Sequence, residues 1–217
     1  MIRVYKSSNA PSSLTTTQSY DGEDVKKQLL ADQHDKCYLC ERNRDTDFEI
    51  EHHKSENHYP DLVQDWNNLY MGCGYCNKKK SDSFDNMLAP KDFDIEDEIE
   101  QSIDFANKKA IFSPRIDDEL HNETKELLCR IYNGTKRVRT FKEERFFEQV
   151  LGIVNRFADL IKKYQETPNF DNKKAVSDEL AIDKEMLGFK YWIIKKDEVL
   201  SQVFANDIIW NKTACVL

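Results

Sequence analysis

The most regular pattern of hydrophobic residues lies in the second half of the chain. Phe147, Val150, Leu151, Val154, Phe157, Ala158, Ile161 and Tyr164 recur at steps of three and four residues. This spacing predicts a long amphipathic helix, and Thr140 with Glu143 forms a capping box that would start it. A second helix is predicted over 120–131, because its apolar residues have the same spacing and Asn133-Gly134 follows as a stop signal.

The other expected elements are shorter. Helices are expected over 22–33, 74–81 and 171–186, and strands over 48–51, 69–71 and 111–112. Residues 7–22 are rich in Ser and Thr, which indicates an extended arm or loop. Residues 189–194 fit a strand or a helix, and Ala89-Pro90 marks a break. The pattern therefore predicts an α-rich α+β protein, organised as a unit over 1–90 and a mainly helical part over 91–217.

Cysteine spacing adds a candidate metal site to this picture. Four of the six cysteines form two CxxC pairs, Cys37 with Cys40 and Cys73 with Cys76. Pairs about 35 residues apart can close one tetrahedral four-cysteine zinc site. The remaining two, Cys129 and Cys215, are interpreted as buried or incidental thiols. The N-terminus has no apolar signal core, so we expect a cytoplasmic protein with reduced thiols and a structural zinc rather than disulfides.

Charge is spread unevenly along a chain whose formal net charge is −8. A net negative charge argues against a protein that binds nucleic acid on its own, because such proteins normally carry a basic surface. Residues 92–104 hold seven acidic side chains and no basic one, whereas residues 125–163 hold ten Lys and Arg against five acids. Each run is either a solvated helix face or a functional surface, the basic one for phosphates and the acidic one for docking a protein.

A second set of chemically useful residues lies within and just after the cysteine framework. Glu51 and His52 are adjacent, Asn68 follows, and Asn77 comes directly after Cys76. Taken alone, a histidine is more often structural than catalytic, and an asparagine at the start of a helix is more often a cap. A zinc scaffold would need only the four cysteines, so the presence of all four polar residues at this spacing favours an enzyme.

The arrangement resembles the HNH endonucleases, whose catalytic unit is a ββα-metal fold. In this resemblance the general base falls on His52, the acidic residue before it on Glu51, the middle Asn on Asn68 and the last motif residue on Asn77. The resemblance implies a hairpin that carries the histidine and a helix that starts near Cys73. Many members of the family have Asp where this chain has Glu51.

Phosphodiester hydrolysis needs an activated water and stabilisation of the charge on the phosphate and the leaving oxygen. His52 would take the proton from water, and Asn68 would hold the loop and orient it. Glu51 and Asn77 would hold a single Mg²⁺ or Mn²⁺, because carboxylate and amide oxygens suit these ions better than zinc. The motif needs one base only, so His53 is interpreted as structural, and His58 and His121 as surface residues.

A narrower resemblance covers residues 1–90. Met1-Ile2-Arg3-Val4, Tyr59-Pro60-Asp61-Leu62 and Asn67-Asn68-Leu69 are similar to the HNH nuclease subunit of Septu-type anti-phage systems and retron-associated relatives. In that group the nuclease works with an ABC/SMC-like ATPase, so the resemblance implies such a partner, docked through the helical second half. This chain has no P-loop or GxGxxG of its own.

Two alternatives stay open from the sequence. DNA is the favoured substrate, but a structured RNA such as tRNA presents the same phosphodiester, and no residue here is identifiable as a reader of the 2′-hydroxyl. The chain could also be a non-catalytic zinc module that scaffolds a partner or binds nucleic acid.

Overall fold

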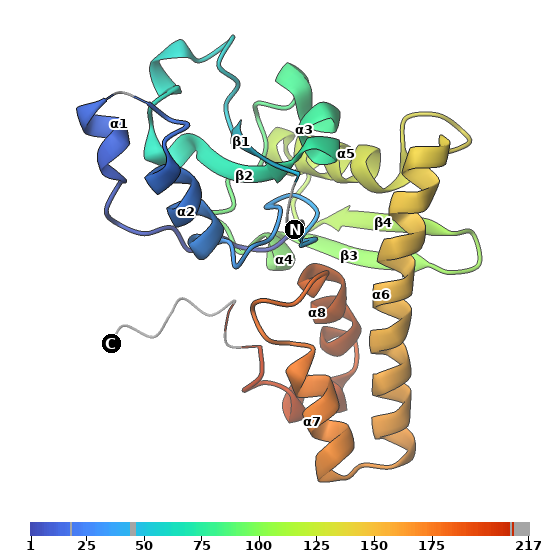
Figure 1. Cartoon of the computed structure of the whole chain (residues 1–217). Coiled ribbons are helices and arrows are strands. Elements are labelled where there is room, and N and C mark those ends of the chain that lie inside the picture. Colours follow the sequence, from blue (N-terminus) through green and yellow to red (C-terminus); the bar gives the residue numbers. More distant parts are fainter. Residues whose placement is uncertain (18, 44–46, 209, 211–217) are drawn as a thin grey trace.

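The structure is a computed structural model that describes residues 1–17, 19–43, 47–208 and 210. Its helices are α1 (Ser12–Thr16), α2 (Glu23–Asp32), α3 (Gly74–Lys80), α4 (Ile95–Glu98), α5 (Glu119–Asn133), α6 (Phe141–Glu166), α7 (Phe170–Asp178), α8 (Leu187–Lys195) and α9 (Glu198–Val203) (Figure 1). Its strands are β1 (Phe48–His52), β2 (Leu69–Cys73), β3 (Ile99–Asp104) and β4 (Lys109–Pro114). The fold is α-rich α+β, as predicted, with two separate two-stranded sheets. Cys215 lies outside the described residues.

β1, β2 and α3 form a hairpin followed by a helix, which is the expected ββα arrangement. The strands are antiparallel, with Phe48 opposite Cys73 and His52 opposite Leu69. The N–H of Gly74 donates to the carbonyl of Asp47 at 3.1 Å, which fixes the start of α3 beside the start of β1. Figure 1 shows the hairpin between α2 and α3.

The long helix α6 begins at the predicted capping box and buries most of its predicted apolar row. Thr140 and Glu143 form the capping box, and the N–H of Thr140 donates to Glu143 Oε2 at 2.7 Å. Its buried residues include Phe147, Val150 and Val154 in the largest hydrophobic core, and Phe157 and Ile161 in a second. The apolar row is therefore largely part of the protein core and is not an open docking face.

The largest core joins the two halves of the chain. It takes Tyr70 and Cys76 from the first half and Phe112, Tyr132 and Phe146 from the second. The second core gathers side chains of α7, α8 and α9 around the C-terminal part of α6. The parts over 1–90 and 91–217 thus share buried surface, and the hairpin unit is supported from both.

Several segments differ from the sequence-based expectation. The helix expected over 171–186 ends at Asp178, and Met186 takes a left-handed φ of 58° before α8 begins. Residues 189–194 are helical, within α8. The sequence does not predict β3, whose Ile99 lies opposite Pro114 in an antiparallel pair with β4. The expected arm over 7–22 contains the short helix α1.

The acidic run over 92–104 is used inside the chain. Its ion pairs are Arg3 with Asp94, Lys195 with Asp97, Arg115 and His121 with Glu98, Lys196 with Glu100 and Lys91 with Asp92. Most of this run is neutralised by nearby cations, so it is not the free acidic surface that a basic partner would require. No helix in the described part of the chain is long and apolar enough to cross a membrane.

Candidate functional site

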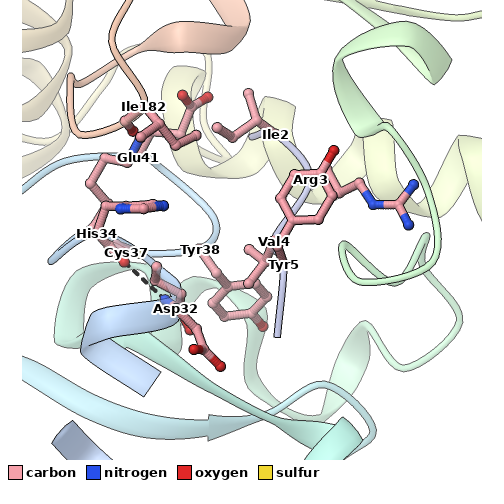
Figure 2. Close-up of a pocket in the computed structure, with 12 residues that line it drawn as sticks. Ile2, Arg3, Val4, Tyr5, Asp32, His34, Cys37, Tyr38, Glu41 and Ile182 are labelled. Atoms are coloured by element: carbon pink, nitrogen blue, oxygen red, sulfur yellow. Dashed lines mark hydrogen bonds between the residues drawn. The ribbon is translucent and has the colours of Figure 1, made fainter. Parts of the chain in front are cut away.

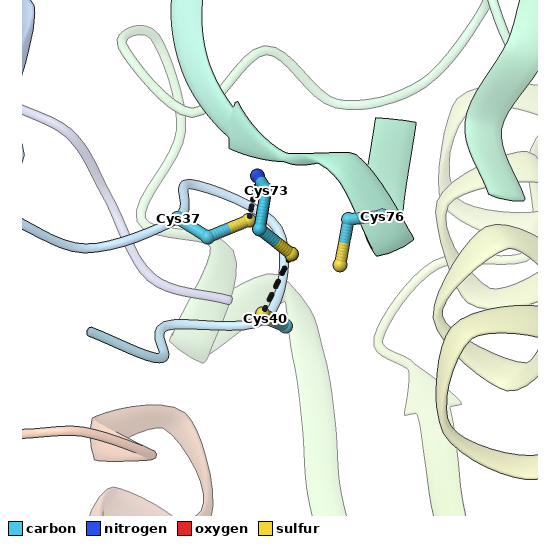
Figure 3. A group of neighbouring side chains, drawn as sticks. All are labelled: Cys37, Cys40, Cys73 and Cys76. Atoms are coloured by element: carbon cyan, nitrogen blue, oxygen red, sulfur yellow. Dashed lines mark hydrogen bonds between the residues drawn. The ribbon is translucent and has the colours of Figure 1, made fainter. Parts of the chain in front are cut away.

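Four cysteines from two distant segments meet in the interior. Cys37 and Cys40 lie in the loop after α2, Cys73 ends β2, and Cys76 lies in the first turn of α3. All four are fully buried, and their sulfur atoms lie within 4.8 Å of one another. Figure 3 shows the four side chains converging from these segments.

The geometry of this cluster fits a zinc ion. Zn–S bonds of about 2.3 Å in a tetrahedron put the sulfur atoms about 3.8 Å apart, and Sγ of Cys40 lies 3.9 Å from Sγ of Cys73. The N–H of Cys73 donates to Cys37 Sγ at 3.3 Å, a bond that would orient a ligand. Burial raises the pKa of Cys40 and Cys76, whereas hydrogen bonds with the other cysteines lower the pKa of Cys73. The cluster is therefore consistent with a structural zinc.

The two faces of β1 have different neighbours, because successive side chains of a strand point to opposite sides. Phe48 and Ile50 pack against the hydrophobic cluster that includes Leu29 of α2. Glu49 and Glu51 point toward α3 and contact polar side chains there. The hairpin therefore has an apolar face toward α2 and a polar face toward α3.

His52 is buried at the end of β1, with only 5% of its side chain exposed. Its Nε2 lies 3.0 Å from the carbonyl oxygen of Val63, and its ring packs edge-on against Tyr20 at 4.8 Å. A carbonyl can only accept, so Nε2 carries the proton and donates. In the neutral ring Nδ1 is then the basic nitrogen. Nδ1 lies 3.7 Å from Oε1 of Glu56, whose side chain is 52% exposed.

Asn68 ties down the loop that supplies the Val63 carbonyl. Its Oδ1 accepts from the N–H of Lys54 at 2.7 Å, and its Nδ2 donates to the carbonyls of Lys54 at 3.0 Å and Leu62 at 3.2 Å. Leu62 directly precedes Val63. Asn68 thereby fixes both ends of the loop and, through Val63, the orientation of the His52 ring.

Glu51 and Asn77 lie at the β1–α3 interface, on the face of β1 opposite to the His52 side chain, and each contacts another residue. Oε1 of Glu51 lies 2.9 Å from Nζ of Lys80, and Nδ2 of Asn77 donates to Oε2 of Glu49 at 2.7 Å. Burial raises the pKa of Glu51, and the charge of Lys80 opposes this rise. The carboxylates and the amide oxygen of Asn77 are donors of the kind that Mg²⁺ and Mn²⁺ prefer.

Three further polar residues, Lys80, Glu49 and His53, lie at or beside the β1–α3 interface. The sequence motif does not include them. Lys80 is almost fully buried, and its Nζ also donates to the carbonyl of His52 at 2.8 Å. Glu49 accepts the hydrogen bond from Asn77. His53 is buried, and burial, with the charge of Lys80 adding to it, lowers the pKa of His53 to about 4. Strand alternation was the available signal, because positions 49, 51 and 53 fall on one face.

Two further histidines, His58 and His121, lie in different environments. His58 is exposed, as expected, and its Nδ1 lies 2.7 Å from Asp85. The expectation for His121 is wrong: the residue is buried, with Nδ1 2.7 Å from Asp118 and Nε2 3.1 Å from Glu98. Asp118 also caps α5, and Glu98 comes from a separate segment that the sequence could not place beside it. Burial lowers the pKa of His121, but the hydrogen bonds to both carboxylates outweigh it and raise the pKa.

A small pocket lies between the N-terminal segment and the loop that carries Cys37 (Figure 2). It is lined by side chains such as Ile2, Tyr5, Tyr38 and Glu41. Its volume is about 20 Å³, which is room for one water molecule. This pocket is therefore too small for a nucleotide.

Comparison with known proteins gives one partial match. The chain is 39% identical over 59 residues to the Septu protein PtuB of Bacillus thuringiensis. The matched stretch covers 26% of this chain and 23% of that protein's length. No family model matches the chain. Over part of its length, therefore, this α+β protein with a buried four-cysteine cluster is similar to a Septu protein.

Proposed function

We propose that this protein is a metal-dependent endonuclease of the HNH type that hydrolyses phosphodiester bonds, with DNA as the favoured substrate. The observation that carries the proposal is the state of His52. Its Nε2 donates to the Val63 carbonyl at 3.0 Å, so the neutral ring presents Nδ1 as a base.

The chain's own residues divide the work of hydrolysis. Nδ1 of His52 takes a proton from the attacking water, on the side where Glu56 is half exposed to solvent. A correctly placed base of this kind contributes roughly 10²–10⁴-fold to the rate. Asn68 keeps the Val63 carbonyl in place, and so maintains the tautomer and the direction of the ring.

Glu51 and Asn77 would hold the divalent metal between β1 and α3. When bound, Mg²⁺ or Mn²⁺ stabilises charge on the phosphate and on the leaving oxygen. Lys80, which contacts both Glu51 and the His52 carbonyl, keeps the carboxylate and the strand end together. Zinc at the four cysteines would hold β2 and α3 to the loop after α2, and has no role in the bond breaking.

The biological setting is proposed from the resemblance to Septu proteins. The protein would act in the cytoplasm as the effector nuclease of an anti-phage complex, with an ABC/SMC-like ATPase as partner. The helical second half is the proposed docking part. The apolar residues exposed there, such as Phe170 at 78% and Val199 at 68%, are candidates for that contact.

Cleavage by the assembled complex tests this function. The protein would be purified with its genomic-neighbour ATPase and incubated with supercoiled plasmid or total tRNA, with and without added Mg²⁺ or Mn²⁺. The proposal expects plasmid nicking that requires the added metal. Cleavage of tRNA alone would move the substrate to structured RNA, and a zinc-loaded complex that cuts neither would favour the scaffold.

A further inference from the structure

We propose that the loop between α5 and α6, together with the first turn of α6, binds the phosphate backbone of duplex DNA. This inference rests on the proposed function and adds where the substrate lies. The surface, called here the basic loop surface, consists of Lys136, Arg137, Arg139, Lys142 and Arg145. It concentrates positive charge in a chain whose net charge is −8.

The positive charge of this surface is largely uncompensated. Two of its neighbouring acids are occupied, because Glu143 pairs with Lys79 and Glu144 pairs with Arg139, and a third, Asp47, lines a hollow together with Lys142 and Arg145. Lys136, Arg137, Lys142 and Arg145 are exposed. Among the described residues, no carboxylate lies within salt-bridge distance of these four. Such cations are free to displace counterions from a polyphosphate.

The basic loop surface adjoins the helix that carries Asn77. Tyr75 of α3 stacks on Phe146 of α6, with ring centroids 4.5 Å apart. Nζ of Lys142 lies 6.0 Å from the Tyr75 ring centroid, and Asn77 is two residues further along α3. Residues two apart in a helix point to different sides, so this contact places the first turn of α6 beside α3 but on another side of it than Asn77. DNA bound to the basic loop surface would therefore reach Asn77 across α3.

The turn between β3 and β4 extends the surface on its other side. Nη2 of Arg139 donates to the carbonyl of Lys108 at 2.6 Å, which ties the turn to the loop. A hollow of about 430 Å³ lies between them, lined by Lys108, Lys109, Lys136 and Arg137 among others. Its lining also includes Asn107, Asn133 and Glu144, and the hollow is large enough to admit a phosphate and its sugar. The basic loop surface thus continues from the first turn of α6 to this hollow.

Duplex DNA fits this surface better than a single strand. Proteins that bind single strands combine positive charge with several aromatic rings on which successive bases stack. Here the one strongly exposed aromatic residue in the loop and first turn of α6 is Phe141, at 78%. Charge without a stacking platform matches the rigid, evenly spaced phosphates of a duplex.

The test measures binding without cleavage, using the full chain. A fluorescent duplex of about 30 base pairs would be titrated with Mg²⁺ and Mn²⁺ omitted, from about 50 to 200 mM salt, and the logarithm of the affinity plotted against the logarithm of salt concentration. The test variant combines Lys136→Ala, Arg137→Ala, Lys142→Ala and Arg145→Ala. At the lowest salt it should bind at least about tenfold more weakly, and the slope should shrink by about 0.9 for each phosphate that the protein no longer neutralises.

Two matched variants separate this surface from general charge. Lys162→Ala, Lys163→Ala, Lys173→Ala and Lys174→Ala together remove the same charge near the other end of α6, a helix about 39 Å long at 1.5 Å per residue. This variant should bind nearly as the wild type does. Exchanging Lys for Arg and Arg for Lys at the four test positions should also preserve binding, because the charge is unchanged.

Each outcome decides the proposal. Equal loss in the test and distal variants, or no loss in either, would overturn it, as would a wild type that fails to bind duplex at the lowest salt. Binding of tRNA but not duplex through this surface would overturn the commitment to DNA. If the surface binds duplex as expected while the complex cuts nothing, the proposed function fails and the binding surface stands.

Discussion

Replacing Asn68 with Ala should cost both stability and cleavage, because this side chain closes the loop that orients His52. The change removes three hydrogen bonds, at 2.7, 3.0 and 3.2 Å, and leaves backbone groups of Lys54 and Leu62 without this partner. At roughly 1 kcal/mol for each group, the loss is on the order of 3 kcal/mol. For a chain of this size, that corresponds to a fall in the melting temperature of about 6–12 °C.

The neighbouring Asn67 provides the matched control. It is exposed, and the hydrogen bond it makes is from its backbone N–H to Asp65, which Asn67→Ala retains. Thermal unfolding and plasmid nicking would be measured for both variants at equal zinc content. Asn68→Ala should melt well below Asn67→Ala and, below its melting temperature, should cut more slowly because the Val63 carbonyl no longer holds the His52 ring. Equal melting temperatures and equal rates would refute the role assigned to Asn68.

Three further changes follow from the site. Cys73→Ser should give an insoluble or unfolded protein, whereas Cys129→Ser should stay folded. The reason is that structural zinc binding contributes roughly 10–16 kcal/mol, which is comparable to the whole stability of a domain. A well-folded wild-type protein that contains no zinc by metal analysis would exclude the site. Glu51→Gln should abolish cleavage and lower the melting temperature, since it leaves buried Lys80 without its carboxylate, and Glu49→Gln at the exposed position should melt close to the wild type. For His121 the folded pKa is raised above 6.5, so its stabilisation is present below that pH and is lost as pH rises through the folded pKa; urea unfolding should show that His121→Gln costs more at about pH 5.5 than at about pH 8.5, and equal costs would contradict this.

The sequence was sufficient for the parts of the fold that local chemistry determines. The capping box of Thr140 and the apolar row after it predicted α6, and the CxxC spacing predicted the cysteine cluster. The strand and helix signals predicted β1, β2 and α3 as separate segments, and the resemblance to the HNH endonucleases implied that they form a hairpin followed by a helix. In each case the residues that signal the element also form most of its stabilising contacts.

The parts that escaped prediction depend on contacts between distant segments. β3 looked like part of a solvated acidic run, because Lys196, which pairs with Glu100 of this strand, lies nearly a hundred positions later. His121 is buried against Glu98, which belongs to another segment, so its burial could not be predicted from the local sequence either. The ion pair of Glu51 with Lys80 joins a strand to a helix, and its partners carry no motif that links them.

The central claim is that His52 is the base of a phosphodiester hydrolysis. The most direct measurement is the cleavage rate of His52→Ala relative to wild type, in the assembled complex with saturating Mg²⁺ and at equal zinc content. His58→Ala, at an exposed histidine outside the proposed machinery, serves as the control. We predict a loss of roughly 10²–10⁴-fold for His52→Ala and a rate close to wild type for His58→Ala; a folded, zinc-loaded His52→Ala protein that cuts at the wild-type rate would contradict the claim.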